Sequence, residues 1–161
     1  MKTEKILNMI VKDFIKYNEG KRSRQLMVGR CQYDGTDLIG YTSEGQNAYF
    51  ILPSYFPFDI EKLTANEMKF NNFTKNVPLT RLEDTHSKID TTLQGKRATL
   101  RVYKTADGKN VYFNDKLFAG FDSDIVLTGT GTTTPAYVWE GGSIGSAFPA
   151  GLVLPTKYIE H

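Results

Sequence analysis

The sequence predicts an α+β fold that is mainly antiparallel β-sheet, with an N-terminal amphipathic helix and one or two short helices. Apolar residues recur at helical spacing most clearly near the N-terminus. Beyond it, short runs alternate apolar or aromatic residues with polar ones and are separated by Gly-containing turn signals. The length of 161 residues fits a single domain over residues 1–161.

The first expected element is a helix over residues 4–18, with Thr3 available as its N-cap and Gly20 just past its end. Its apolar stripe should pack on a sheet and leave Lys5, Lys12 and Lys16 on or beside the exposed side. The positions of that stripe are Ile6, Leu7, Ile10, Val11, Phe14 and Ile15.

A β-meander is expected next. The runs at 25–33 and 37–53 are strand-like, and Asp34-Gly35 and Glu44-Gly45 offer the turns between strands. Pro53 and Pro57 then interrupt strand structure, and apolar residues at 60, 63 and 68 have spacings compatible with a short helix. The polar stretch 77–94 is expected to be connecting structure or an exposed edge.

The second half should contain two hairpins. Residues 98–115 alternate about Asp107-Gly108, and residues 116–121 would form a helical turn or bend before a strand at 124–129. The glycine-rich tail is predicted to be a closing hairpin, with Pro135 before its first strand, a wide turn over 141–151, and Pro155 after its second. These glycines serve backbone geometry in this interpretation, because the phosphate-loop and dinucleotide motifs are missing.

Charge is unevenly distributed along the chain. Residues 1–30 contain eight Lys/Arg and three Asp/Glu, a net of +5, whereas residues 31–161 contain twelve and fifteen, a net of −3. A basic segment can mark a surface that meets a polyanion, while a single lysine can equally belong to the solvated face of a helix.

The sequence offers no convincing catalytic set. His86 lies near Glu83, Asp84 and Asp90, which is compatible with a metal or acid/base cluster, but a solvated polar loop is the favoured interpretation. The single cysteine, Cys31, is expected to be a buried structural thiol. We therefore expect no catalytic residues, no metal site, no cofactor and no enzyme activity.

No apolar run reaches the length of a membrane span, and the N-terminus lacks the apolar region of a signal peptide. The expectation is a cytoplasmic protein without a membrane partner. Aromatic residues make up 12% of the chain and crowd the segment 49–58. Most should fill the core, whereas exposed ones could stack nucleobases or receive a peptide.

The N-terminal basic helix, the meander, the stretch VYFNDKLFAGF and the ending PAYVWEGG…GLVLPTKY resemble a single domain of the DNA polymerase sliding clamps, especially divergent phage or mobile-element types. The resemblance implies duplex DNA and replication proteins as partners, with tethering and no catalysis. A clamp subunit contains more than one such domain, so encirclement of DNA would require a homo-oligomer or another chain. The sequence also departs from the family in lacking a second confident long helix.

The resemblance also implies roles for particular residues. Contacts to DNA phosphates fall to Lys12, Lys16, Lys21, Arg22 and Arg24. The strand Leu152 to Tyr158 would border a groove for partner peptides. The candidate partner-binding residues, taken with the aromatic segment, are Tyr55, Phe56, Leu152, Leu154 and Pro155. The alternative is a β-rich protein-protein interaction module, such as a phage or mobile-element accessory protein, without nucleic-acid binding.

Overall fold

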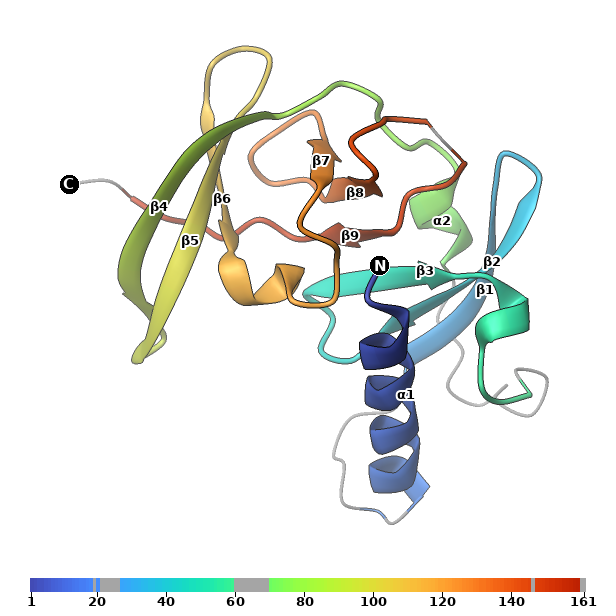
Figure 1. Ribbon diagram of the computed structural model, residues 1–161. Helices are drawn as coiled ribbons and strands as arrows, with labels where there is room; N and C mark the ends of the chain where they lie inside the picture. The colour runs from blue at the N-terminus through green and yellow to red at the C-terminus, as the bar shows by residue number, and fades with distance from the viewer. Residues whose placement is uncertain (19, 21–26, 60–69, 146, 160–161) are drawn as a thin grey trace. The chain divides into compact units, whose positions relative to one another are not determined.

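Helix α1 (Thr3–Asn18) begins the chain, as its apolar periodicity predicts. The computed structural model (Figure 1) describes residues 1–18, 20, 27–59, 70–145 and 147–159. The chain forms two compact units, Met1–Val77 (unit 1) and Pro78–His161 (unit 2). The expected α+β class with dominant antiparallel sheet is confirmed. The expectation of one domain stays a prediction.

Unit 1 contains the expected meander, with β1 (Met27–Tyr33), β2 (Thr36–Thr42) and β3 (Asn47–Ile51) paired antiparallel in sequence order. The β1–β2 turn uses two residues with positive φ, 47° at Asp34 and 78° at Gly35. This combination suits the twist of a tight hairpin and explains why Asp-Gly marks the turn. After β3 the chain makes a short 3₁₀ turn, η1 (Pro53–Tyr55), and later α2 (Asn71–Thr74). The short helix expected around residues 60–68 lies outside the described residues.

Both faces of the unit 1 sheet are covered, which explains why β2 is buried at consecutive positions instead of alternate ones. Neighbouring residues on a strand point to opposite faces. Gly40 faces the ring of Phe70, where a Cβ would lie 2.4 Å from ring carbons. Tyr41 faces the other way, and its hydroxyl donates a hydrogen bond to the Asp13 carboxylate of α1. Helix α1 and the Phe70 ring therefore lie on different faces of β2, and Figure 1 shows α1 and α2 on different sides of the sheet.

The apolar stripe of α1 is buried mainly at Ile6, Ile10 and Phe14, which are 0%, 0% and 6% exposed. Burying such side chains contributes about 1.5–3 kcal/mol each. The expectation for Ile15 is wrong, since this residue is 51% exposed. Ile15 lies about 100° around the helix from Phe14, beyond the edge of the buried face.

Unit 2 contains a three-stranded antiparallel sheet of β4 (Glu83–Leu93), β5 (Lys96–Lys104) and β6 (Asn110–Asn114). The polar stretch expected to be connecting structure or an exposed edge includes β4, the edge strand of this sheet, so the second alternative is confirmed. A 3₁₀ turn, η3 (Asp115–Phe118), follows β6 where a helical turn is predicted.

The end of the chain forms β7 (Ile125–Thr128), β8 (Ala136–Glu140) and β9 (Gly151–Val153), paired antiparallel in order. The closing hairpin is thereby confirmed. Trp139 is 1% exposed, and its Nε1 donates to Thr128 Oγ1 at 2.9 Å across the β7–β8 pair. Beyond β9 the chain runs beside β6, where Thr156 N donates to Tyr112 O at 2.8 Å.

Candidate nucleic-acid interface

Four lysines follow one side of the N-terminal helix. Lys5, Lys12 and Lys16 lie on α1, and Lys2 precedes its first residue while its carbonyl oxygen accepts a helical hydrogen bond from Ile6 N, 3.1 Å away. With Met9, the positions 2, 5, 9, 12 and 16 are separated by 3, 4, 3 and 4 residues. Because residues three and four apart are neighbours on a helix surface, they form a single stripe, which we call the lysine row.

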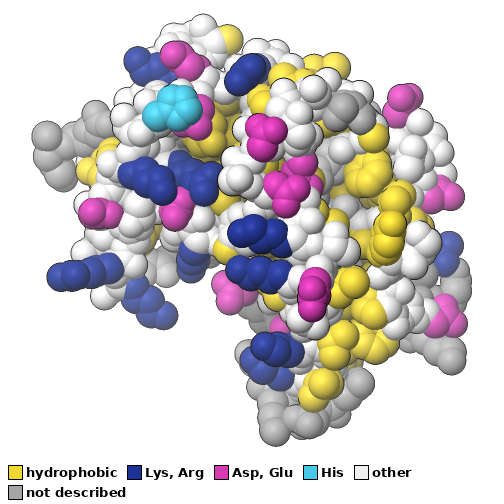
Figure 2. Space-filling model, viewed as in Figure 1, with side chains coloured by type: hydrophobic (Ala, Val, Ile, Leu, Met, Phe, Trp, Pro, Cys, Tyr) yellow, Lys and Arg dark blue, Asp and Glu magenta, His cyan; other side chains and the backbone are white. Residues whose placement is uncertain are grey.

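The lysine side chains of the row face solvent. All four lysines are exposed and Met9 is half-buried. On the face shown in Figure 2, dark blue side chains follow one side of α1 while yellow ones follow the other. No position of the row is a carboxylate, so the helix presents positive charge along roughly 21 Å between residues 2 and 16. This arrangement is suited to successive contacts with an extended polyanion.

Helix α1 is fixed on unit 1 by contacts on its other faces. Asp13 is 9% exposed and accepts the Tyr41 hydroxyl hydrogen bond. Phe14 stacks on Phe58 with ring centroids 4.1 Å apart and meets Phe56 edge-on at 6.4 Å. Because Phe14 lies on nearly the opposite side of the helix from the lysine row, the aromatic cluster and the row are separate surfaces.

The predicted DNA-contacting residues divide into two groups. Lys12 and Lys16 lie together on the lysine row. Lys21, Arg22 and Arg24 lie outside the described residues. Lys5, expected on the exposed side but not among the DNA contacts, joins the same stripe, and so does Lys2, which the sequence analysis missed. The 3-4-3-4 spacing is visible in the sequence once the helix is known to begin at Thr3.

The candidate partner-binding residues differ in the exposed fraction of their side chains. Tyr55 is 57% exposed in η1, whereas Phe56 is only 9% exposed and packs with Phe14. Leu152 is 5% exposed within β9. Leu154 and Pro155 are half-buried after that strand. Their role in binding a partner stays a prediction, and Tyr55 is the member of the set with the most accessible side chain.

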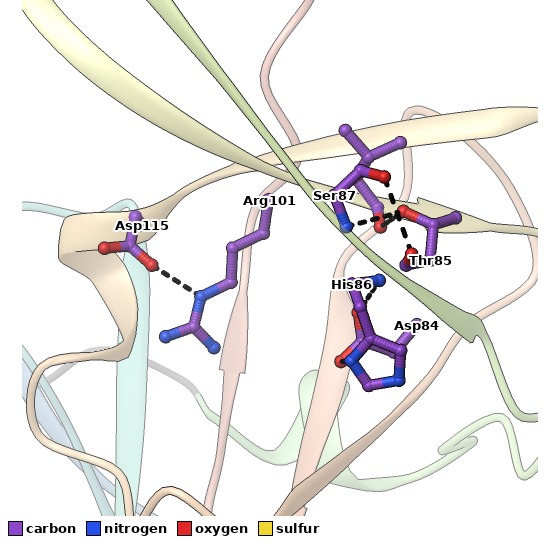
Figure 3. A network of polar contacts seen from close by, with 7 residues as sticks. Asp84, Thr85, His86, Ser87, Arg101 and Asp115 are labelled. Atoms are coloured by element: carbon purple, nitrogen blue, oxygen red, sulfur yellow. Dashed lines mark hydrogen bonds and ion pairs between the residues drawn. The ribbon is translucent and has the colours of Figure 1, made fainter.

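His86 lies in a β-bulge, where the register between β4 and β5 shifts between Asp84 and Ser87 (Figure 3). Its backbone φ is 56°, and its N donates to Asp84 Oδ1 at 2.8 Å. The imidazole is 86% exposed, with Nδ1 3.6 Å from Asp84 Oδ2. The favoured expectation of a solvated polar residue matches this exposure, although the residue belongs to a strand and not to a loop. Within the described ranges, no group of three His, Cys, Asp or Glu residues is arranged to hold a metal ion.

Cys31 is buried in β1 at 2% exposure, as expected for a structural thiol. Burial raises its pKa to about 11, and the nearby Thr74 hydroxyl only partly opposes this shift. The thiol is therefore protonated at neutral pH. A thiolate is the nucleophilic form, so the surroundings of Cys31 suppress its reactivity.

A second polar cluster was missed by sequence reasoning. Arg101 Nε donates to Asp115 Oδ1 at 2.6 Å (Figure 3). The Arg101 guanidinium carbon lies 4.1 Å from the centre of the Phe118 ring. Lys88 Nζ lies 3.6 Å from the same carboxylate oxygen. The hydrogen bond from Arg101, with the two positive charges, holds the pKa of Asp115 below its ordinary value. The cluster joins β4, β5 and η3 and neutralises cations that would otherwise face solvent.

Among the described residues, no helix has the length and apolar character needed to cross a membrane. Comparison of the chain with protein-family models, with curated proteins and with solved structures found no match.

Proposed function

We propose that the protein is a non-enzymatic, DNA-associated module that binds the phosphate backbone through the lysine row. The observation that carries this proposal is the acid-free 3-4-3-4 spacing of Lys2, Lys5, Met9, Lys12 and Lys16 on an exposed helix side. Such a row gives affinity without base recognition, because lysine contacts to phosphate release counterions irrespective of sequence. In this role the module would tether or recruit replication proteins, as the clamp resemblance implies.

The spacing suits a phosphate backbone. Lys5 and Lys16 are separated by eleven residues, or about 16 Å along a helix axis. Each strand of duplex DNA carries a phosphate about every 3.4 Å along its axis. Flexible lysine side chains can therefore reach several phosphates from one helix. If all four lysines bind, the logarithm of the affinity should fall against the logarithm of salt concentration with a slope of about −3.6.

The test is binding of a fluorescently labelled duplex, followed by anisotropy over a salt series. We expect the variant Lys5→Ala/Lys12→Ala/Lys16→Ala to lose most of its affinity and to have a slope shallower by about 2.7. The matched control is Lys96→Ala/Lys104→Ala/Lys116→Ala, which removes the same net charge from exposed positions of unit 2. Equal binding by the two triple variants would refute the lysine row as the interface.

A second candidate function is binding of a protein partner through η1. The observation that favours it is the 57% exposure of Tyr55, beside rings that are already packed together. Tyrosine combines a large apolar area with a hydrogen-bonding hydroxyl and is enriched in interfaces. Tyr55→Ala should weaken such a complex with replication proteins without changing the unfolding midpoint, whereas Phe56→Ala should lower that midpoint. Unchanged affinity for each replication protein tested after Tyr55→Ala would remove this surface.

A further inference from the structure

Strand β4 is an edge of the unit 2 sheet. It pairs with β5 along one side, and the described residues place no strand on its other side (Figure 1). An edge strand leaves part of its N–H and C=O groups available to another chain. At eleven residues, β4 is the longest strand of the described sheets.

The two halves of this edge differ. The bulge between Asp84 and Ser87 interrupts the register, and Glu83 and Asp84 place acids beside it. Bulges and charges are common means of blocking edge pairing. From Ser87 to Leu93, by contrast, the register with β5 is regular and the sequence has no proline. The second half can therefore accept a further strand.

The centre of this second half is self-complementary. Lys88 and Asp90 share one face of the strand, and Ile89 between them points to the other. In an antiparallel pairing with a second copy about a two-fold axis at Ile89, each Lys88 lies opposite the other copy's Asp90. Opposite charges directly across a strand pair are favourable, and like charges are unfavourable.

Other registers are worse. Moving the axis to residue 88 or 90 places two lysines or two aspartates directly opposite each other. The two-fold axis could also fall between two residues. The charged face of one copy would then lie on the same side as the apolar face of the other, because side chains alternate between the two faces of a strand. The pairing of charges and the matching of strand faces thus both favour a two-fold axis at Ile89.

The apolar side chains on the other face of β4 are also compatible with a two-fold axis at Ile89. Ile89 and Leu93 are half-buried and pack against the cluster of Leu100, Val102 and Tyr112. The axis at Ile89 brings this side chain against its own counterpart, so the remaining exposed part of the Ile89 side chains would be covered. The charged face would meanwhile gain two reciprocal ion pairs.

We propose that two copies of this chain associate through the Ser87–Leu93 edge of β4, antiparallel and two-fold symmetric at Ile89. The proposal does not depend on DNA binding. A dimer would carry two lysine rows, so a single polyanion could be bound at two places with higher avidity.

The experiment is sedimentation velocity over a concentration series, without DNA. Wild type should show a concentration-dependent dimer. Lys88→Asp and Asp90→Lys, which each place like charges opposite one another, should weaken the association at least about tenfold. The double variant Lys88→Asp/Asp90→Lys should restore it, because the pairs are then exchanged.

The double variant also controls for the intramolecular contact of Lys88 with Asp115, since the single Lys88→Asp variant and the double variant lose that contact equally. A monomeric wild type at every concentration would overturn the proposal. Dimerisation that the single variants leave unchanged, or that the double variant fails to restore, would overturn it as well. Circular dichroism verifies that each variant is folded.

A cross-link tests the register directly. Directly opposed residues in an antiparallel pair have Cα atoms about 4.5–5.5 Å apart, a range that permits a disulfide. Ile89→Cys should therefore form a dimer on oxidation, seen on a non-reducing gel. Ser87→Cys, on the same strand face, should not, because its counterpart would lie four residues away along the strand. Equal cross-linking of both variants would contradict the axis at Ile89.

Discussion

Two sets of cations, one in each unit, differ in whether a carboxylate lies among them. In unit 2, Arg101 and Lys88 converge on the Asp115 carboxylate, and Lys109 lies 3.6 Å from Asp107 Oδ2. On the α1 stripe of unit 1, lysines follow one another with only Met9 between them. The carboxylates of unit 2 lie between or beside these cations, whereas no position of the lysine row is itself a carboxylate. For the binding of a polyanion, the comparison teaches that the number of cations matters less than whether a carboxylate lies among them.

The largest effect is expected from Gly40→Ala, which tests the sheet on which the row is mounted. The added Cβ would lie 2.4 Å from ring carbons of Phe70. Such overpacking costs about 1–3 kcal/mol of the free energy of unfolding, measured by urea denaturation. The matched change in unit 2 is Gly129→Ala, whose Cβ would meet Leu82 Cδ1 at an ordinary 3.4 Å. Equal losses in the two variants would contradict the close packing on Gly40.

Met9→Glu places a carboxylate inside the lysine row without removing any lysine. Position 9 is four residues after Lys5 and three before Lys12, so the new acid can pair with both. We expect about a tenfold loss of affinity for duplex DNA in the anisotropy titration. Met9→Gln supplies the control with the same shape and no charge. If glutamate and glutamine behave alike, charge on this stripe does not govern binding.

Tyr41→Phe removes the hydroxyl that donates to Asp13 and so weakens the attachment of α1 to β2. The expected cost is about 1 kcal/mol of unfolding free energy, since a buried carboxylate loses a donor. The urea midpoint should fall while the affinity of the folded protein for DNA stays near the wild-type value. An unchanged midpoint would show that this contact does not stabilise unit 1.

The smallest effect is expected from Asp115→Asn. This change removes the carboxylate from among the cations of unit 2, so that they resemble the lysine row of unit 1. Freed from the carboxylate, Lys88 and Arg101 should raise DNA affinity about twofold to threefold at low salt. The stability effect depends on pH, because the folded pKa of Asp115 lies below the ordinary 3.8. Its contribution is present above that value and disappears as the pH falls through the folded pKa.

Urea midpoints at about pH 6 and about pH 3 measure this dependence. Asp115→Asn should be less stable than wild type at the higher pH, and the difference should shrink at the lower one. A difference that is constant between the two would mean that the carboxylate charge is not what stabilises the cluster. A DNA affinity below that of wild type would contradict the proposed neutralisation of Lys88 and Arg101.

Strong local signals explain most of what the sequence predicts about the fold. The α1 stripe and the Asp-Gly turns at 34–35 and 107–108 need no distant partner, so their structures are read from neighbouring residues. For the region of β4 the sequence predicts only connecting structure or an exposed edge, because its alternation is weak and most of its residues are polar. Its turn, Gln94-Gly95, has φ of 50° and 80° and so joins β4 to β5 as a two-residue hairpin. Glycine after a polar residue, at Gln94-Gly95, is the sequence signal for this turn.

By itself the sequence determined the fold class, the N-terminal helix, the main hairpins and the burial of Cys31, because backbone preference and apolar spacing are local properties. It also placed Lys12 and Lys16 on one helix. Only the tertiary structure decided which faces of that helix are covered, that Phe56 is packed while Tyr55 is exposed, and that Arg101 meets Asp115. These features depend on contacts between residues that the chain brings together after folding, and sequence spacing does not encode those distances.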